Sequence, residues 1–347
     1  MKIREIEIAG YERVACAQDT ETGLHAIIAV HNTTLGPAVG GIRMWRYASE
    51  EEALQDVLRL AEGMTFKSAV AETGLGGGKA VIIGDARKSK TPALMAAMGR
   101  FIDAFEGRYY GAEDVGTSTA DIEHVRRSTR WVCGLPRHLG GSGDPSPFTS
   151  RGVFLGIEAA VAERFGSPSL KGRTVAIQGL GNVGMGVAQQ VHAAGARLMV
   201  ADVHAAHVER AVARFGARSV EPERIYDVPA DVFAPCALGA ILNDDTIPRL
   251  HCPVIAGGAN NQLLEARHGR MLLEKGTIYA PDFVINAGGI VNIGVEFEPG
   301  GYNEARAHEK VARIGAAVTE VLRLARERHI PSSEAAILLA EKRLAKS

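Results

Sequence analysis

Residues 175–191 read VAIQGLGNVGMGVAQQV, and this stretch decides the fold of the second half of the chain. A strand-like run leads into Gly179, Gly181 and Gly184, and a helix-like pattern follows. This is the G-x-G-x-x-G spacing of a dinucleotide-binding turn, in which the N-terminus of the helix faces the pyrophosphate. The spacing alone is a weak signal in a chain with 40 glycines, but a strand before it and a helix after it are the required context. The alternative is a tight turn without a ligand.

An acidic residue, Asp202, ends the next strand-like segment, RLMVAD. In dinucleotide-binding folds a carboxylate roughly 20 residues beyond the first glycine binds the ribose hydroxyls of the adenosine. A carboxylate there repels the 2′-phosphate of NADP, and no arginine directly follows Asp202. The sequence therefore predicts NAD as the cofactor.

Strand-like and helix-like segments alternate on both sides of this turn, from TVAIQ to FVINAG. Such alternation predicts a parallel, doubly wound sheet in an α/β fold. A helix is expected before it over roughly 150–165, and two helices after it over about 303–328 and 333–345. The Gly- and Pro-rich stretch LGGSGDPSP (139–147) predicts a hinge between domains.

The first ~135 residues read as helices packed on a sheet. MKIREIEIAG alternates like an edge strand, and AVIIG (80–84) resembles a buried strand. Ser49 precedes Glu52 at capping-box spacing, and Thr91 followed by Pro92 marks the start of a second helix. We therefore predict two α/β domains with a cleft between them. The first, 1–138, would bind substrate and mediate oligomerisation, and the second, 148–324, would bind NAD, with helices at ~325–347 packing back on the first.

The composition excludes several classes of protein. Of 347 residues 46% are hydrophobic and 23% charged, with a formal net charge of −1, so there is no electrostatic footprint for nucleic acid. No apolar run is long enough for a membrane span, and no signal peptide is evident. The four cysteines contain no C-x-x-C pair and the histidines show no metal-ligand spacing, so we expect buried thiols, no metal and a cytoplasmic location.

Residues 73–85, TGLGGGKAVIIGD, raise the question of what Lys79 does. A phosphate-binding P-loop is excluded, because Thr73 stands where that motif needs glycine and Ala80 where it needs serine or threonine. The alternative to a functional role is a solvated surface lysine.

Several further motifs carry a family resemblance: GPAVGGIRMW (36–45), GMTFKSAV (63–70), GLGGGK (74–79), AEDVGTS (112–118), ALGAILNDDTIP (237–248), IAGGANNQL (255–263) and DFVINAGG (282–289). Together with GLGNVG they resemble the amino acid dehydrogenase superfamily, which contains glutamate, leucine, phenylalanine and valine dehydrogenases. The resemblance covers about residues 25–345 and is nearest to leucine dehydrogenase. It implies NAD-dependent, reversible oxidative deamination of an L-amino acid to a 2-oxo acid and ammonia.

The resemblance also implies roles for three charged residues. Lys67 would hold the substrate carboxylate, Lys79 would be the catalytic base, and Asp114 would exchange protons with the amino group. Burial beside a second lysine would favour the neutral amine that a general base requires. Glycines before Lys79 would leave room for substrate. Asp114 could equally cap the helix expected from VGTSTADIE.

Cofactor contacts are implied for the whole GLGNVG turn, which adds Leu180, Asn182 and Val183 to the three glycines. Ala237 and Gly239 lie where the family backbone passes the cofactor, and Thr149 matches a threonine that binds the carboxamide. Thr149 could also cap the helix from residue 150. Asn260 and Asn261 match a segment that touches the nicotinamide ribose and the substrate amino group. We assign Asn260 to the cofactor and Asn261 to the substrate, although the sequence does not distinguish them.

The predicted substrate is an aliphatic, branched-chain amino acid. Glutamate dehydrogenases carry a lysine where this chain has Val39, and a side-chain carboxylate buried against Val39 would cost several kcal/mol. By the family pattern Gly41, Ala112, Ile290 and Ile293 complete the substrate site. The same chemistry on an aromatic amino acid is an alternative, and a catalytically inactive NAD-binding regulatory protein is another. The family also implies a homo-oligomer, either a dimer or an octamer, and no membrane or nucleic-acid partner.

Overall fold

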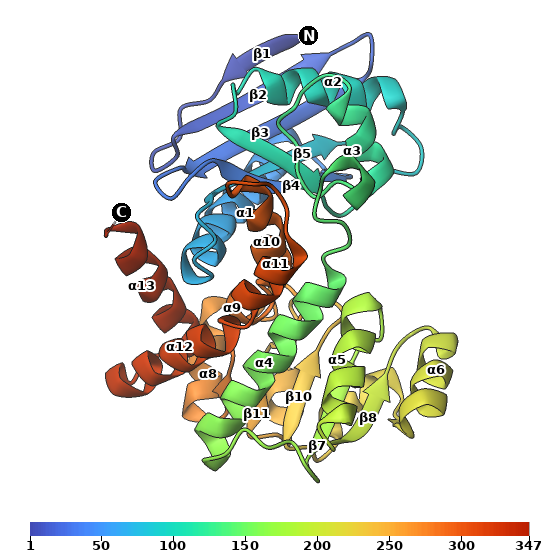
Figure 1. The fold of residues 1–347 in the computed structure, drawn as a ribbon, viewed down its shortest axis with the longest axis vertical. Coiled ribbons are helices and arrows are strands. Elements are labelled where there is room, and N and C mark those ends of the chain that lie inside the picture. The colour runs from blue at the N-terminus through green and yellow to red at the C-terminus, as the bar shows by residue number, and fades with distance from the viewer. Residues whose placement is uncertain (347) are drawn as a thin grey trace. The chain divides into compact units, whose positions relative to one another are not determined.

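The computed structural model describes residues 1–346, which form two compact units (Figure 1). Unit 1 comprises Met1–Asp144, Ile293–Glu304 and the described residues from Glu341 onward. Unit 2 comprises Pro145–Asn292 and Ala305–Ala340. Each unit contains a six-stranded sheet with helices packed on it, so the chain has the predicted α/β fold with two domains. The change from unit 1 to unit 2 at Asp144 and Pro145 falls inside the Gly- and Pro-rich stretch.

The sheet of unit 1 is mixed. Its strands lie in the order β1 (Lys2–Glu5), β2 (Arg13–Asp19), β3 (Leu24–Asn32), β5 (Gly76–Ile83), β4 (Ala38–Trp45) and β6 (Tyr109–Glu113). The first four strands in this order pair antiparallel with one another, whereas β4 runs parallel to both β5 and β6. The expected edge strand at the N-terminus is confirmed, because β1 pairs only at the outer side of β2 among the described strands.

Helices cover both faces of this sheet (Figure 1). The long helix α1 (Glu50–Val70) buries Ala53, Val57 and Ala61 against one face, and α2 (Pro92–Asp103) and α3 (Thr119–Arg126) pack on the other. Both predicted caps are confirmed: the Ser49 hydroxyl accepts the Glu52 amide at 3.1 Å and the Thr91 hydroxyl accepts the Leu94 amide at 3.1 Å. Two short 3₁₀ turns, η1 (Arg137–Leu139) and η3 (Val295–Phe297), also belong to this unit.

The glycines before Lys79 are part of a strand, not a loop, which corrects the prediction that the strand begins at Ala80. β5 starts at Gly76, so Lys79 lies in the middle of the sheet. A Cβ on Gly77 would lie 2.1 Å from the Thr65 amide nitrogen of α1, and one on Gly76 would lie 2.2 Å from the Asn32 carbonyl oxygen. These glycines therefore let the protein's own backbone segments pack closely, where we had expected room for substrate.

The sheet of unit 2 is entirely parallel. Its strands lie in the order β12 (Ile278–Tyr279), β11 (Val254–Ile255), β10 (Val232–Pro235), β7 (Thr174–Gln178), β8 (Arg197–Ala201) and β9 (Arg218–Ser219). Chain order reverses between β7 and β10, which is the topological switch point of a doubly wound fold. The surrounding helices and turns are α4 (Ser146–Phe165), α5 (Asn182–Ala193), α6 (Ala205–Phe215), η2 (Pro222–Asp227), α7 (Thr246–Arg249), α8 (Ala266–Glu274), α9 (Asp282–Ile285) and α10 (Gly288–Gly294).

Two helix predictions need correction. α4 begins at Ser146, earlier than expected, because Pro147 occupies a first-turn position where its missing N–H costs nothing. The single helix expected over 303–328 is two helices, α11 (Glu304–Val311) and α12 (Ile314–Arg328). The two residues between these helices, Ala312 and Arg313, are neither glycine nor proline. Directly after them α12 packs on α4, where a Cβ on Gly315 would lie 3.4 Å from the Leu155 carbonyl oxygen. The last helix, α13 (Ser332–Leu344), agrees with the prediction.

The helices of the described residues are not suited to span a membrane. None of them combines the length and the apolar character that crossing a bilayer requires.

Candidate active site

Strand register in unit 1 brings three predicted site residues side by side. Ile42 of β4 pairs with Ala80 of β5, so the preceding residues, Gly41 and Lys79, are neighbours across the two strands. Gly41 pairs with Ala112 of β6 on its other side. Val81 packs with α1, and side chains alternate along a strand, so Lys79 projects toward the same face as Val81.

Lys79 forms an ion pair with Asp114, the residue that follows β6. The Lys79 Nζ lies 2.8 Å from Asp114 Oδ2, and Lys79 is only 6% exposed. Burial by itself raises the pKa of Asp114, but the positive charges of Lys79 and Arg43 outweigh it and hold that pKa below its ordinary value. Asp114 is therefore a carboxylate in the folded protein, paired with a buried lysine.

The alternative role of Asp114 as a helix cap is wrong. The N-cap of α3 is Ser118, which forms a capping box with Asp121. The Asp114 backbone is fixed differently: its amide donates to the Thr117 hydroxyl at 2.9 Å, and that hydroxyl lies 2.8 Å from the Ile42 carbonyl oxygen, to which it donates. The Asp114 side chain is thus left to interact with Lys79 and Arg43.

Gly41 makes this arrangement possible. A Cβ on Gly41 would lie 2.5 Å from the Asp114 Cβ and 2.9 Å from the Glu113 carbonyl oxygen, closer than atoms can approach. The absence of a side chain at Gly41 therefore lets Asp114 reach Lys79 across β4.

A second layer of charges, which the sequence patterns did not indicate, holds Asp114. Arg43 donates through Nε to Asp114 at 3.1 Å and through Nη1 to Asp56 of α1 at 3.0 Å. Asp56 also accepts from the Tyr47 hydroxyl at 2.7 Å and from Arg59 at 2.9 Å. Arg43 belongs to the stretch GPAVGGIRMW. Its partners, Asp56 of α1 and Asp114 after β6, lie outside that motif, so the motif alone does not reveal the ion pairs.

Lys67 lies on the last turn of α1 and is half-buried. It is two residues from Thr65, whose backbone packs directly against Gly77 of β5. α1 and β5 therefore bring the two predicted site lysines to the same end of α1.

Three of the four apolar side chains predicted to line the substrate site, Val39, Ala112 and Ile293, lie in unit 1. Val39 is 1% exposed and Ala112 is 6% exposed. A Cβ on Gly134 would lie 3.7 Å from Ile293 Cδ1 and 3.8 Å from Ala112 Cβ, so Ala112 and Ile293 flank the same glycine. The fourth, Ile290, is buried in the part of α10 that belongs to unit 2.

The glycine between Ala112 and Ile293 is held by Glu296, another residue that no sequence motif indicated. The Glu296 carboxylate accepts the Gly134 amide at 3.1 Å and the Ser142 amide at 2.7 Å. Burial raises the pKa of Glu296 even though these hydrogen bonds oppose it. Only the folded structure brings this acidic residue to the loop at 134–142.

In unit 2 the three glycines of the GLGNVG turn have three different environments. Gly179 has φ +91, and a Cβ there would lie 2.7 Å from the Ala237 Cβ. A Cβ on Gly184 would lie 2.0 Å from the Gly179 carbonyl oxygen, so this glycine lets α5 pack against the turn. Gly181 is exposed, and a Cβ there would have no heavy atom of the described chain within 4 Å. A tight turn, an open backbone and close helix packing are what a dinucleotide-binding turn requires of its glycines.

Asp202 lies directly beside this turn, at the end of β8. The Gly179 amide donates to the Ala201 carbonyl at 2.8 Å, and Asp202 accepts the amides of Leu180 at 2.6 Å and His204 at 2.8 Å. Burial raises the pKa of Asp202, but these amides and His207, 3.3 Å from the carboxylate, outweigh it, and the pKa lies below its ordinary value. The structure thus holds a carboxylate at the turn.

The other predicted cofactor residues of unit 2 follow β10 and β11. Ala237 contacts the Gly179 position, and a Cβ on Gly239 would lie 2.6 Å from the Asn260 carbonyl oxygen. Asn260 accepts from Asn286 Nδ2 at 2.7 Å, whereas Asn261 is exposed with φ 51, a left-handed conformation. Asn286 is a further residue of this region that was not predicted from the sequence.

Thr149 does not cap a helix, because it lies inside α4. Its hydroxyl donates to the Pro145 carbonyl at 3.1 Å. A Cβ on Gly289 would lie 3.1 Å from that hydroxyl oxygen, so α4 and α10 pack together at Thr149. The NAGG motif and Thr149 are thereby adjacent.

The residues of unit 2 fit a dinucleotide. Gly181 and Asn182 are exposed at the N-terminus of α5, and Val183 is half-buried behind them. Among the described residues no side chain caps this helix, so its first amides are available to a ligand. Leu180 is fully buried and offers only its backbone.

Comparisons with known proteins match nearly the whole chain to one family of dehydrogenases. Residues 11–131 match the family described as the Glu/Leu/Phe/Val dehydrogenase dimerisation domain, and residues 140–211 and 199–347 match Glutamate/Leucine/Phenylalanine/Valine dehydrogenase. Leucine dehydrogenase of Thermoactinomyces intermedius is 53% identical over 99% of this chain and 94% of its own length. Phenylalanine dehydrogenase of Lysinibacillus sphaericus is 45% identical over 95% of this chain and 87% of its own. The solved structure of L-tryptophan dehydrogenase from Nostoc punctiforme is 44% identical with a TM-score of 0.86, covering 97% of this chain and 98% of that one.

Proposed function

Because the chain belongs to the Glu/Leu/Phe/Val dehydrogenase family and is an amino acid dehydrogenase, we propose that it deaminates an aliphatic, branched-chain L-amino acid. The products are the 2-oxo acid and ammonia, the reaction is reversible, and the cofactor is NAD. The observation that carries this proposal is the buried 2.8 Å pair of Lys79 and Asp114, set among the apolar positions Val39 and Ala112. An apolar wall beside a charged pair suits a substrate with a charged backbone and an aliphatic side chain.

Each charged residue has a distinct task in this proposal. Lys67 binds the substrate carboxylate through a charge-assisted hydrogen bond. The ion pair with Asp114 holds Lys79 in its charged form, contrary to the neutral amine expected from the sequence, so Lys79 must first release a proton. The neutral amine then accepts a proton from the water that attacks the iminium carbon, which is general base catalysis. Asp114, within hydrogen-bond distance of Lys79, exchanges protons with the substrate nitrogen. Arg43 keeps Asp114 ionised and in position.

The dinucleotide is held in unit 2. Gly179, Gly181 and Gly184 with the start of α5 bind its pyrophosphate, and Asp202 binds the adenosine ribose. When bound, it accepts the hydride from the substrate Cα. Thr149, Ala237, Gly239 and Asn260 orient its nicotinamide end.

Cofactor choice tests the role of Asp202. Replacing it with asparagine keeps an acceptor for the Leu180 amide but removes the charge that repels a 2′-phosphate. We expect Asp202→Asn to lower the ratio of kcat/KM for NAD to that for NADP by about tenfold or more, equivalent to about 1.4 kcal/mol. Asp231→Asn is the matched control, because Asp231 also accepts a backbone amide in unit 2, from Thr174 at 2.7 Å. A wild-type enzyme that prefers NADP, or an unchanged ratio in Asp202→Asn, contradicts the assignment.

Substrate choice is tested by steady-state rates with NAD and the twenty common amino acids. We expect leucine, valine and isoleucine to give the highest kcat/KM and glutamate one of the lowest, because Val39 offers no charge to a side-chain carboxylate. The competing proposal is an aromatic substrate. It is favoured by the 44–45% identity to tryptophan and phenylalanine dehydrogenases and by the small side chains of Val39 and Ala112. Highest kcat/KM with phenylalanine or tryptophan would establish that alternative.

The family match also bears on assembly. Residues 11–131 match a domain described as a dimerisation domain, which supports our proposal of a homo-oligomer, either a dimer or an octamer. Light scattering on the purified protein distinguishes these states from a monomer.

A further inference from the structure

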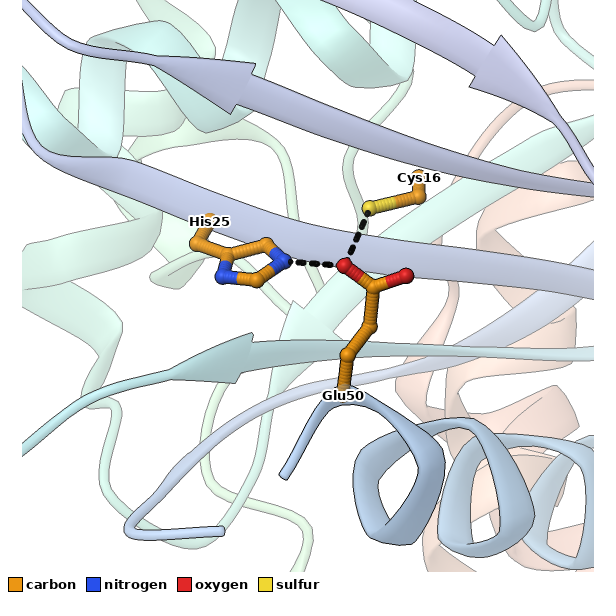
Figure 2. A group of neighbouring side chains, drawn as sticks. All are labelled: Cys16, His25 and Glu50. Atoms are coloured by element: carbon orange, nitrogen blue, oxygen red, sulfur yellow. Dashed lines mark hydrogen bonds and ion pairs between the residues drawn. The ribbon is translucent and has the colours of Figure 1, made fainter. Parts of the chain in front are cut away.

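Three potential metal ligands meet in unit 1 at one end of α1. Cys16 lies on β2, His25 on β3 and Glu50 in the first turn of α1 (Figure 2). Cys16 pairs with Ile27 across the antiparallel strands, and His25 is two residues from Ile27, so both side chains project from the same face of the sheet. Three segments that are distant in sequence thus bring a thiol, an imidazole and a carboxylate together.

The spacing of the three groups suits a tetrahedral metal ion. One oxygen, Glu50 Oε2, lies 2.8 Å from His25 Nε2 and 3.7 Å from Cys16 Sγ (Figure 2). One ligand atom from each residue can be chosen so that all lie within 4.8 Å of one another. Zinc bonds of about 2.3 Å to sulfur and about 2.0–2.2 Å to nitrogen and oxygen place neighbouring ligands roughly 3.3–3.6 Å apart. The sulfur–oxygen distance already agrees, and the imidazole and carboxylate need to separate by about half an ångström. The Cys16 sulfur and the His25 nitrogen, which lie within 4.8 Å of each other, must come to about 3.6 Å.

Charge and exposure also suit a zinc ion. A thiolate and a carboxylate together neutralise a divalent ion, and Arg4, paired with the outer oxygen of Glu50, leaves one positive charge beside the site. Cys16 is 3% exposed, whereas the side chains of His25 and Glu50 are 30% and 35% exposed. The cluster is therefore closed on the cysteine side and accessible on the other, where water can complete the coordination.

The remaining contacts are compatible with a bound ion. Arg4 donates to the other oxygen of Glu50, Oε1, at 2.5 Å, so Oε2 stays directed at His25 and Cys16. Ligating carboxylates commonly carry such an outer hydrogen bond. Gln18 Nε2, 3.3 Å from His25 Nε2, has to turn away when a metal binds.

We propose that Cys16, His25 and Glu50 form a zinc-binding site, with water as the fourth ligand. The site lies at the N-terminal end of α1, whereas Thr65, near the other end, packs on Gly77 of β5, two residues from Lys79. Glu50 and Thr65 are about 22 Å apart along the helix, at 1.5 Å per residue. Zinc there joins β2, β3 and α1 and takes no part in the chemistry at Lys79. No metal was expected from the sequence, because no two of these ligands are close enough along the chain to form a spacing motif.

Cobalt titration tests the site directly in the full-length protein. After treatment with a chelator, the protein is titrated with Co²⁺, whose thiolate charge-transfer band and tetrahedral d–d bands report a cysteine ligand. We expect one Co²⁺ per chain, its displacement by Zn²⁺, and a rise of the thermal midpoint with added Zn²⁺. A wild-type protein without the charge-transfer band overturns the proposal.

Variants identify the ligands. Cys16→Ala abolishes the charge-transfer band, and His25→Ala and Glu50→Gln each weaken zinc binding at least about tenfold. Cys252→Ala, the loss of a buried cysteine outside the cluster, leaves the band unchanged. If Cys16→Ala fails to fold, the zinc affinity of His25→Ala tests the proposal, because His25 is part-exposed and its replacement removes a ligand with little loss of packing. A band that persists in Cys16→Ala, or unchanged affinity in His25→Ala, overturns the proposal.

Discussion

The chemical centre of unit 1 and the nucleotide-binding turn of unit 2 are built on different principles. Around Lys79 and Asp114 the protein uses charged side chains on neighbouring strands, fixed by strand register and by the chain of ion pairs through Arg43 to Asp56. Around Gly179–Gly184 it uses the backbone, with side chains removed where they would obstruct. A side-chain site depends on the position of each charged group, whereas a backbone site depends on the space around it. The two should therefore respond differently to substitution.

The largest expected effect is at Lys79. Lys79→Ala removes the proposed proton acceptor, and general base catalysis is typically worth about 10²–10⁴-fold in rate. We expect kcat to fall by that factor while NAD affinity, measured by titration of the same protein, stays near the wild-type value, because the nucleotide turn belongs to unit 2.

Lys90→Ala is the matched control for this experiment. Lys90 is also a part-buried lysine of unit 1 in an ion pair, with Asp121 at 2.7 Å, but it lies outside the proposed site. Its replacement should leave kcat within a few-fold of wild type. Near-normal turnover of Lys79→Ala would show that Lys79 has no part in the chemistry.

The next prediction tests whether Gly41 of β4 determines the position of Asp114 relative to Lys79. Gly41→Ala places a methyl group 2.5 Å from the Asp114 Cβ, so Asp114 must move away from Lys79. A displacement of about 1 Å at reacting groups can cost about 100-fold in rate, and the overpacking costs about 1–3 kcal/mol of stability. Turnover and the free energy of unfolding are measured together on the same variant.

Gly63→Ala is the control for adding a methyl group in unit 1. It lies within α1 and nothing surrounds its Cβ position within 4 Å among the described residues. It should stabilise the protein by about 0.5–1 kcal/mol, since alanine favours a helix over glycine. If Gly41→Ala kept full turnover, Gly41 would not be what positions Asp114.

The contrast between the two regions also explains what the sequence could predict. The nucleotide turn was readable because its requirements are local: glycines at fixed spacing between a strand and a helix, and an acidic residue after the next strand. Lys79 and Asp114 were found only through motif resemblance. Their ion pair and its contacts with Arg43 and Asp56 join strands and a helix that are far apart in sequence. The same is true of the hydrogen bonds from Gly134 and Ser142 to Glu296.

Even where a motif was recognised, its physical reason was partly misjudged. The glycines before Lys79 were expected to make space for substrate, but they accommodate Thr65 and Asn32 of the protein itself. Thr149 was expected at a helix start, but Pro147 occupies the first turn of α4, so the helix begins at Ser146 and Thr149 lies inside it. Local signals thus locate a motif, and packing decides what it does.

A third prediction separates two glycines of the same turn. Gly181→Ala adds a methyl group to open space, so the protein should fold normally but bind NAD about tenfold more weakly, as the methyl obstructs the approach of the pyrophosphate. Gly184→Ala puts the methyl 2.0 Å from the Gly179 carbonyl oxygen and should lower the free energy of unfolding by about 1–3 kcal/mol. If the two variants had the same NAD affinity and the same free energy of unfolding, Gly181 would not serve mainly in binding and Gly184 mainly in packing.

The smallest effect concerns two partly buried carboxylates of unit 1, Glu296 and Asp114, whose pKa values are shifted in opposite directions. The pKa of Glu296 is raised by burial, so its contribution to stability is fully present below its ordinary pKa of 4.5 and is lost as pH rises through the raised value. The free energy of unfolding of the wild type, minus that of Glu296→Gln, should therefore fall as pH rises through that window. Asp114 has a lowered pKa, so the corresponding difference against Asp114→Asn should rise with pH up to its ordinary pKa of 3.8. Urea unfolding of the three proteins across this pH range measures both slopes, and slopes of the same sign would mean that burial does not dominate at Glu296.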